Sequence, residues 1–287
     1  MYPVRFFSIS LLISCLIIGV TGADLTVRFL DVGEGDAVLF QEEGKNMLID
    51  GGTKDSRNLT LDYMRYLNIT RLDAVLLTGP DEGRTGAMTT ILNHTPAAHL
   101  FLGEWNSTEP SYLDLLTKLD EDNTEVTRVS PGDPVPFSGE LEISLLNGAQ
   151  PEPGPGSGIL VPLITYHSVR FLLMGDAPTL SGDVRAQVIR VGDHGSRRAT
   201  DAAFIHAVSP EIAVISTGSG KGEGPEPDTI NLLESNGASV LRTDTDGVII
   251  IDTDGKEYQV GKMRLAPYHT ISLVSVVETR APAQSGS

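Results

Sequence analysis

A chain of 287 residues with 40% hydrophobic residues can bury a sizeable core, which excludes an intrinsically disordered protein. It carries 38 Asp and Glu against 21 Lys and Arg, a formal charge of −17. Because nucleic-acid affinity rests largely on Lys and Arg that release counterions, this charge argues against DNA or RNA as a partner.

The first 23 residues have the layout of a secretory signal peptide. Arg5 precedes an apolar run over residues 6–20, and small residues follow it up to Ala23. We predict cleavage after Ala23, which makes the protein secreted and, by removing Arg5, changes its charge to −18. Two alternatives stay open: the run is an uncleaved membrane anchor, or Cys15 is lipidated. No other membrane association is expected, and without Cys15 the mature chain has no disulfide.

After the leader, apolar stretches of strand length alternate with segments of helical spacing. The first half predicts strands over 25–33, 36–44, 46–52, 73–78, 99–103, 126–130 and 141–146, with helices over 62–67, 87–93 and 111–119. The second half predicts strands over 159–166, 169–176, 186–195, 211–217 and 239–243, a hairpin over 247–260, and helices over 200–208 and 228–237.

The Pro/Gly-rich segment 150–158 cannot continue a helix or a central strand, so it is expected to be a linker between the two halves. Halves of such mixed composition favour two sheets packed face to face with helices outside. We therefore expect one domain over 24–265, followed by a C-terminal strand and tail over 266–287.

Seven motifs carry a resemblance to a known family. They are FLDVGEGDAVLF, MLIDGG, LDAVLLTG, FLLMGD, VIRVGDHGS, AVISTG and LRTDTDG. In this order and spacing they resemble the metallo-β-lactamase superfamily, and within it the competence-type extracellular domain of DNA-uptake channels and its secreted relatives. The resemblance covers about residues 25–260. It implies an α+β fold, a four-layer αββα sandwich that holds metal at the edge between its sheets.

The first metal motif of that family has lost its histidines here. The resemblance aligns the family's His, His, Asp and His with Gly79, Asp81, Gly83 and Arg84. The flanking Thr78 and Gly86 of the motif are retained.

In the second half, the family's carboxylate is present as Asp176, whereas its His-His-Gly-Ser segment reads Asp193, His194, Gly195 and Ser196. The family's later Gly-His-Pro segment reads GEGPEP here and contains no histidine. Because a catalytic zinc needs about three protein ligands and an open position for water, a zinc hydrolase is not expected.

Arg84 leads to the first functional hypothesis, a secreted binding protein without enzymatic activity or a cofactor. Its guanidinium would replace the metal and neutralise Asp176 and Asp193. A second orientation, in which Arg84 points to solvent, stays open. On either orientation the protein binds an unknown ligand or a partner in the cell envelope.

The alternative hypothesis is a hydrolase with a rebuilt site that acts on a phosphodiester. Its metal ligands would be Asp81, Asp176, Asp193 and His194, a set rich in oxygen that suits Mg²⁺, Ca²⁺ or Mn²⁺ better than Zn²⁺.

Other polar residues have supporting roles in these hypotheses. Asp50 lies beside glycines and is expected to support the loop of Thr78 and Arg84. Asp31 and Asp36 suit the strand-end turns in which they stand. Arg197 and Arg198, together with Arg84, are candidates for an anion-binding pocket.

Overall fold

The computed structural model describes residues 24–148, 158–177, 180, 182–218, 224–265 and 271–280. The predicted leader and nearly all of the predicted linker therefore lie outside the described residues. In the described part of the chain, no helix combines the length and the apolar character needed to cross a bilayer.

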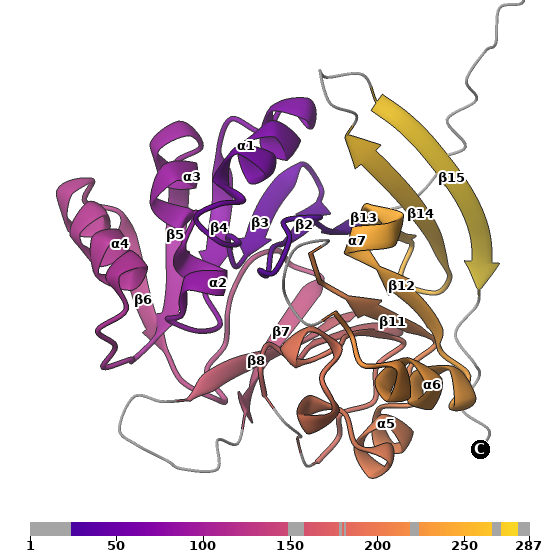
Figure 1. The fold of residues 1–287 in the computed structure, drawn as a ribbon. Coiled ribbons are helices and arrows are strands. Elements are labelled where there is room, and N and C mark those ends of the chain that lie inside the picture. The colour runs from indigo at the N-terminus through magenta and orange to yellow at the C-terminus, as the bar shows by residue number, and fades with distance from the viewer. Residues whose placement is uncertain are drawn as a thin grey trace, which may run out of the picture.

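Two sheets form the centre of the molecule (Figure 1). The first has nine strands in the order β15-β14-β13-β1-β2-β3-β4-β5-β6, and the second has six in the order β12-β11-β10-β9-β8-β7. The strands of the first sheet are β1 (Leu25–Phe29), β2 (Val38–Glu42), β3 (Lys45–Ile49), β4 (Leu72–Leu76), β5 (Ala97–Gly103), β6 (Glu125–Val129), β13 (Val248–Thr253), β14 (Tyr258–Leu265) and β15 (Ile271–Arg280). Those of the second are β7 (Leu141–Gly148), β8 (Ile159–Tyr166), β9 (Val169–Leu173), β10 (Val188–Arg190), β11 (Ile212–Ile215) and β12 (Ser239–Arg242).

Helices cover the outer faces of both sheets, which completes the expected four layers. Those over the first sheet are α1 (Arg57–Tyr66), α2 (Glu82–Thr85), α3 (Met88–His94) and α4 (Pro110–Glu121). The second sheet is covered by α5 (Ala202–Val208) and α6 (Pro227–Ser235), and the short α7 (Thr243–Asp246) connects β12 to β13. The α+β class and the αββα sandwich expected from the sequence are confirmed.

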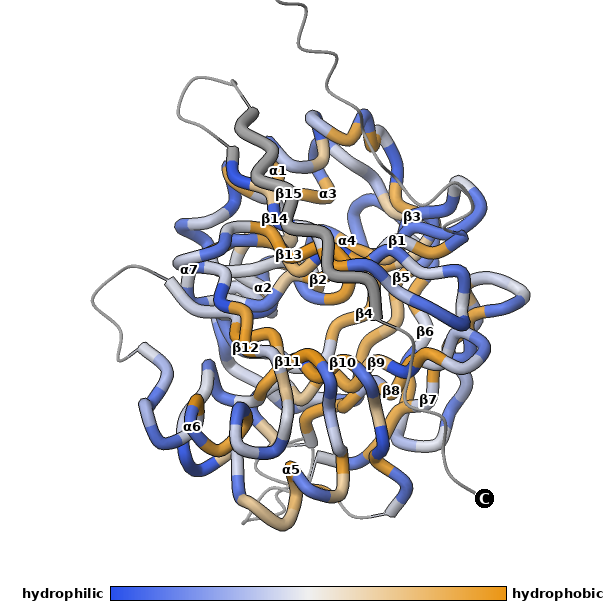
Figure 2. Tube along the Cα trace, turned by 90° about the vertical axis from the view of Figure 1, so that its right-hand side faces the viewer, coloured by the Kyte–Doolittle hydropathy of each residue, from blue (hydrophilic) through white to orange (hydrophobic). Residues whose placement is uncertain are grey.

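The strand sequences explain which faces are buried. Along β9, Phe171 faces the core between the sheets, whereas the next residue, Leu172, faces the core beneath α5 and α6. The rings of Phe171 and Phe40 meet edge to face between the sheets, with centroids 5.8 Å apart. Figure 2 shows hydrophobic residues concentrated along the strands and hydrophilic ones in the surrounding segments.

The boundary between the two sheets does not fall at residues 150–158, the segment that was expected to join the two halves. Strand β7, before this segment, pairs with β8 after it, as Leu141 lies opposite Tyr166. The chain crosses between the sheets earlier, between β6 and β7, and returns to the first sheet when β13 pairs with β1. Strand β15, in the expected C-terminal extension, continues the first sheet beside β14.

Parallel pairing places the candidate site. Strands β3 and β4 run parallel in the first sheet, and β9, β10 and β11 run parallel in the second. The carboxyl ends of parallel strands share one edge of a sheet, where α/β proteins commonly bind ligands. The segments that follow these five strands carry Asp50, Thr78, Asp176, Asp193 and Ser216.

Candidate functional site

Arg84 occupies the centre of this edge. It lies in α2, and only 1% of its surface is exposed. Its Nη1 forms an ion pair with Asp81, and its Nη2 lies 3.0 Å from Oδ2 of Asp176, at the end of the other sheet. Its Nε lies 3.5 Å from Oδ2 of Asp36 and 3.9 Å from Oδ2 of Asp50. One guanidinium therefore faces four carboxylates.

The acids keep this buried guanidinium charged. Burial by itself lowers the pKa of Arg84, but the neighbouring carboxylates, led by Asp81, raise it more. The pKa of Arg84 therefore lies above its ordinary value, and the side chain is a permanent cation at the edge of the sandwich.

Two glycines leave the space that Arg84 fills. A Cβ at Gly79 would lie 3.0 Å from Nη1 of Arg84, and a Cβ at Gly175 would lie 3.0 Å from its Nη2. Gly175 also has a positive backbone φ of 55°, which residues other than glycine rarely adopt. The family resemblance aligns Gly79 with a metal-binding histidine, and any side chain at this position would meet the guanidinium.

Backbone contacts hold the loop of Arg84 in place. The amide of Gly51 donates to the carbonyl of Arg84 at 2.8 Å, and the amide of Asp36 donates to the carbonyl of Gly83 at 3.0 Å. A Cβ at Gly86 would lie 2.4 Å from the nitrogen of Lys54, so the retained glycine permits this close approach.

Asp50 connects β3 to the loop after β4. Its Oδ1 accepts a hydrogen bond from the amide of Thr78 at 2.9 Å, and its Oδ2 accepts one from the Thr78 hydroxyl at 2.6 Å. Burial is the largest influence on its pKa, and Asp36 adds to it, while Arg84 and Thr78 oppose it. The net effect raises the pKa of Asp50 to about 7.

Asp36 and Arg190 are partners that the sequence analysis did not identify as a site. Arg190, the last residue of β10, is 2% exposed, and its Nη2 donates to Oδ1 of Asp36. Its Nε donates to Oγ of Ser216 at 3.4 Å. The signal in the sequence was a charged residue inside the apolar run VIRV, because a buried strand rarely carries a charge without a partner.

Asp81 and Asp176 are the acids nearest to solvent, with 44% and 39% of their side chains exposed. Burial raises the pKa of Asp176, but Arg84 and, to a lesser extent, Arg190 lower it more. The pKa of Asp176 therefore lies below its ordinary value, which makes this carboxylate a weak base at neutral pH.

Asp193 is not a partner of Arg84, contrary to the expectation from sequence. Its carboxylate accepts a hydrogen bond from the hydroxyl of Ser196 and lies 3.6 Å from Nη2 of Arg198. Asp193, His194 and Gly195 have consecutive positive φ angles of 46°, 50° and 87°. This left-handed turn directs the Asp193 carboxylate back toward its own loop.

The ring of His194 is oriented by the chain. Its Nδ1 lies 2.8 Å from the carbonyl oxygen of Ser216. Because a carbonyl can only accept, Nδ1 carries the proton in this contact, and the lone pair of a neutral ring is then on Nε2.

These positions fit a guanidinium better than a metal ion. Within the described residues, no three His, Cys, Asp or Glu side chains are grouped so that they could hold a metal. Of the four ligands of the alternative hypothesis, Asp81 and Asp176 face Arg84, Asp193 faces Ser196, and His194 contacts the Ser216 carbonyl. The permanent positive charge of Arg84 lies next to Asp81 and Asp176, where it would repel a metal cation.

The three arginines of the expected anion pocket each have an acidic partner. Arg84 faces the buried carboxylates, Arg198 lies near Asp193, and Nη1 of Arg197 lies 2.9 Å from Asp228 of α6. The side chains of Arg197 and Arg198 are largely exposed. Their charges are therefore compensated separately.

Curated proteins similar to this chain include proteins of bacterial competence. The chain is 24% identical over 251 residues to ComE operon protein 3 of Bacillus subtilis, covering 78% of this chain and 32% of that protein. It is 23% identical over 228 residues to competence protein ComA of Neisseria gonorrhoeae, covering 79% of this chain and 32% of that protein. The chain thus spans about a third of the length of these relatives.

Solved structures and a family model agree on the fold. YhfI, a metallo-beta-lactamase fold protein from Bacillus subtilis, superposes with a TM-score of 0.56 at 13% identity, covering 79% of this chain and 100% of YhfI. A diphosphatase of the PhnP family gives 0.52 at 14% identity, covering 79% of this chain and 97% of the diphosphatase. The model of the metallo-beta-lactamase superfamily matches residues 30–219, more than half of the chain. The protein therefore belongs to the metallo-beta-lactamase superfamily, with weak homology to competence proteins.

Proposed function

We propose that this protein is a non-catalytic member of its superfamily that acts outside the cell by binding a ligand or an envelope partner. The observation that carries the proposal is the buried guanidinium of Arg84 among Asp36, Asp50, Asp81 and Asp176. The charge that a metal would supply to these acids is supplied by the chain itself.

The charge balance of the cluster supports this proposal. Two buried arginines, Arg84 and Arg190, face four carboxylates, and the pKa of about 7 for Asp50 means that this acid is partly protonated near neutral pH. A divalent cation would have to enter beside a guanidinium that cannot lose its charge. The two arginines therefore offset at least half of the negative charge of the four carboxylates without a metal.

Hydrolysis in this superfamily, as the resemblance implies, uses a metal to generate the nucleophile, and the residues here offer no equivalent. Of the two exposed carboxylates of the cluster, Asp81 and Asp176, both are paired with Arg84, and Asp176 has a lowered pKa. Such a group is poorly suited to take a proton from water. This favours binding over hydrolysis.

The location of the protein and the class of its partner are also part of the proposal. The leader supports secretion, with a membrane tether or lipidation at Cys15 as the alternatives. The names of the relatives refer to competence, but the chain spans only a third of their length. A charge of −17 speaks against nucleic acid, so a protein or small molecule of the cell envelope is the proposed partner.

The test is metal content measured together with activity. The purified protein is equilibrated with Mg²⁺, Mn²⁺ or Zn²⁺, freed of unbound metal and analysed by inductively coupled plasma mass spectrometry. A phosphodiester such as bis(p-nitrophenyl) phosphate is then offered with each metal. We expect neither stoichiometric metal nor turnover.

The opposite result would support the alternative hydrolase with Mg²⁺, Mn²⁺ or Zn²⁺ at Asp81, Asp176, Asp193 and His194. Stoichiometric metal, together with turnover abolished by Asp176→Ala and unaffected by Asp183→Ala, would overturn the proposal. Asp183 is a matched control because it forms an exposed ion pair with Arg170 away from the cluster.

A further inference from the structure

Four asparagines of the chain open the triplet Asn-x-Ser/Thr, the acceptor sequence for N-linked glycans. They are Asn58, Asn68, Asn93 and Asn106, four of the nine asparagines. Because Ser and Thr make up about one residue in six, chance predicts only one or two such triplets among nine asparagines. The excess favours their use as acceptors, and the structure divides the four into two pairs.

The first pair, Asn68 and Asn106, lies in surface segments outside helices and strands. Asn68 is in the turn that follows α1, with a left-handed φ of 55°, and Asn106 is in the segment between β5 and α4. Both are exposed, and so are Thr70 and Thr108, the hydroxyl-bearing residues two positions later. Within the described part of the chain, neither asparagine side chain forms a hydrogen bond. Each triplet is therefore open to an enzyme that has to reach the amide and the hydroxyl together.

The second pair, Asn58 and Asn93, lies inside helices. Asn58 belongs to α1 and Asn93 to α3, and both side chains are exposed. Thr60 completes the triplet of Asn58, but it is 0% exposed and its hydroxyl donates to the carbonyl of Gly51 at 3.3 Å. Thr95 completes the triplet of Asn93 and is 3% exposed. The folded protein therefore hides the hydroxyl of each of these two triplets.

We propose that Asn68 and Asn106 carry N-linked glycans, and that Asn58 and Asn93 do not. The donor class is an oligosaccharide joined through phosphate to a membrane lipid. The amide nitrogen of asparagine attacks C1 of the first sugar, so that a C1–N bond forms and the C1–O bond to the phosphate breaks. The nitrogen loses one proton, the lipid phosphate leaves, and neither an oxidant nor a reductant is needed.

This proposal rests on the proposed location outside the cell, because acceptor triplets of this kind are modified on surface loops of secreted proteins. The hydrophilic glycans would stand on segments that are already exposed and would displace no packed side chain. Modification is therefore compatible with the fold as it is.

Asn106 lies at the same edge of the first sheet as Arg84. Strand β5 runs parallel to β4, so the segment that follows β5 begins at the edge where the loop of Arg84 follows β4. The hydroxyls of Ser111 in α4 and Thr85 in α2 lie 2.7 Å apart, which connects the two segments. A glycan on Asn106 therefore stands on the side of the molecule where the charged cluster lies, whereas Asn68 precedes β4 at the opposite edge.

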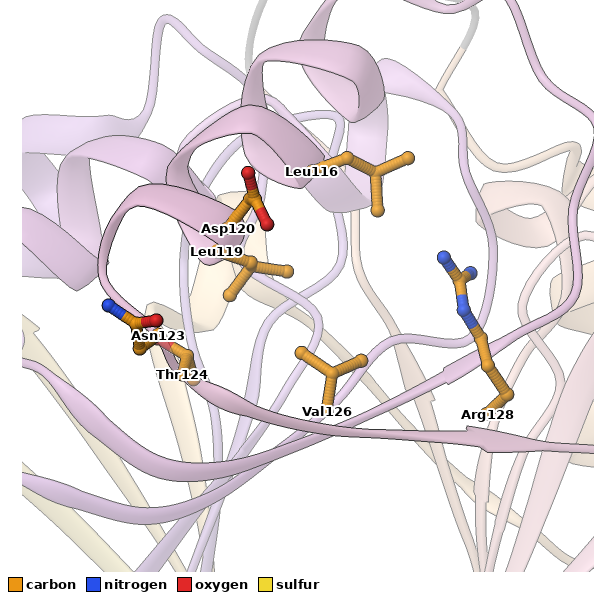
Figure 3. A pocket seen from close by; sticks show the side chains of 7 residues that line it. All are labelled: Leu116, Leu119, Asp120, Asn123, Thr124, Val126 and Arg128. Atoms are coloured by element: carbon orange, nitrogen blue, oxygen red, sulfur yellow. The ribbon is translucent and has the colours of Figure 1, made fainter.

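Asn123 supplies a matched control. It follows α4 as Asn68 follows α1, with a similar φ of 50°. It is exposed at the rim of the groove that α4 and β6 line (Figure 3). Residue 125 is Glu, so no hydroxyl stands two positions later. Asn123 should be unmodified in the wild-type protein, and Glu125→Thr, which completes the triplet, should add a glycan to it.

The test is glycopeptide mapping by mass spectrometry of the protein purified from the organism that encodes it. We expect glycans on most copies at Asn68 and Asn106, and on few or none at Asn58 and Asn93. Absence of a glycan from Asn68 or Asn106, or equal occupancy at Asn58 and Asn93, would overturn the proposal.

The same peptide map separates this proposal from the proposed location. A secreted protein whose first peptide begins at Asp24, with bare Asn68 and Asn106, would overturn the glycans and leave the location intact. A cytoplasmic protein with an intact leader and no glycans would overturn both.

Variants produced in the native host supply the second measurement, the intact mass. Asn68→Gln and Asn106→Gln should each lower it by one glycan. Thr70→Ala should remove the same glycan as Asn68→Gln although it keeps the asparagine, whereas Thr70→Ser keeps the hydroxyl and should keep the glycan. Asn58→Gln is the matched control and should leave the glycan content unchanged. Full glycan mass in Thr70→Ala would contradict recognition of this triplet.

Discussion

Arg190 in the second sheet donates a hydrogen bond to Asp36 in a loop of the first sheet, and both side chains are almost completely buried. Asp36 stands in the loop between β1 and β2, and Arg190 ends β10, 154 residues later in the chain. Asp36 also faces Arg84. One carboxylate therefore links two buried cations and both sheets.

Replacing Asp36 by alanine should destabilise the protein strongly. It leaves Arg190 without its acidic partner in the interior, and breaking a buried ion pair typically costs about 3–5 kcal/mol. Urea unfolding followed by circular dichroism measures the free energy of unfolding. Asp62→Ala, which breaks an exposed pair with Arg65, is the control and should cost less than about 1 kcal/mol. Equal effects of the two variants would show that the buried pair has no special role.

Replacing Arg84 by methionine should make stability fall as the pH rises. Without the guanidinium, the acids around it repel one another when they are charged, and protonation at lower pH relieves this repulsion. We expect a loss of about 3–5 kcal/mol near neutral pH and a smaller loss at pH 5. Arg84→Lys keeps the charge but not the planar fork, so its loss should be intermediate.

The measurement for Arg84 is the urea midpoint at pH 5 and at pH 8, compared with wild type. Arg65→Met, which removes an exposed arginine, is the control. If Arg84→Met left the urea midpoint nearly unchanged at both pH values, this result would contradict a buried cation at this position.

The raised pKa of Asp50 predicts a specific pH dependence. Its pKa moves from an ordinary value of 3.8 in the unfolded chain to about 7 in the fold. Between these values the folded state binds a proton that the unfolded state has lost, so the contribution of Asp50 to stability decreases as the pH rises, by about 1.4 kcal/mol per pH unit, and levels off above pH 7.

The variant Asp50→Asn isolates this contribution. Asparagine can still accept a hydrogen bond from the amide of Thr78 and does not titrate. The difference in unfolding free energy between Asp50→Asn and wild type should therefore grow in favour of the variant from about pH 4 to about pH 7. A difference that stays flat across this range would contradict the raised pKa.

Introducing the imidazoles that the family resemblance aligns with this loop should create a zinc site. In Gly79→His/Asp81→His/Arg84→His the guanidinium is gone and three ring nitrogens join Asp176, which is enough for a zinc site. We expect about one zinc ion per chain by mass spectrometry, against none in wild type. The control Gly79→His alone keeps Arg84, whose Nη1 would lie 3.0 Å from the new Cβ, and should bind no zinc and lose stability. A folded triple variant without zinc would show that the loop no longer has the geometry of a metal site.

Most strands could be predicted from sequence, because apolar runs bounded by glycines are a local signal. The succession of β1, β2 and β3 is one example, although the predicted second strand ran to Gly44, where the structure has a tight turn with positive φ at Glu43 and Gly44. The return of β13 to the first sheet could not be predicted in this way. Leu25 lies opposite Thr253, and no local pattern specifies such a distant pairing.

In the candidate site, too, contacts within one loop could be predicted from the sequence, whereas contacts between distant segments could not. Asp81 and Arg84 belong to one short loop, so their proximity follows from the chain. The contact of Arg84 with Asp36 joins two segments of the first sheet that are distant in the chain, and the contact of Asp36 with Arg190 arises only when the two sheets face each other. Asp193 was expected to meet Arg84, and its left-handed backbone, which directs it to Ser196, had no signal in the sequence.

The cation at the edge of this sandwich is covalently part of the polypeptide. A chelator cannot extract it, and scarcity of transition metals in the surroundings cannot delay its arrival, because it is installed at translation. The positive charge among Asp36, Asp50, Asp81 and Asp176 is therefore present in every copy of the folded chain, whatever the supply of trace elements.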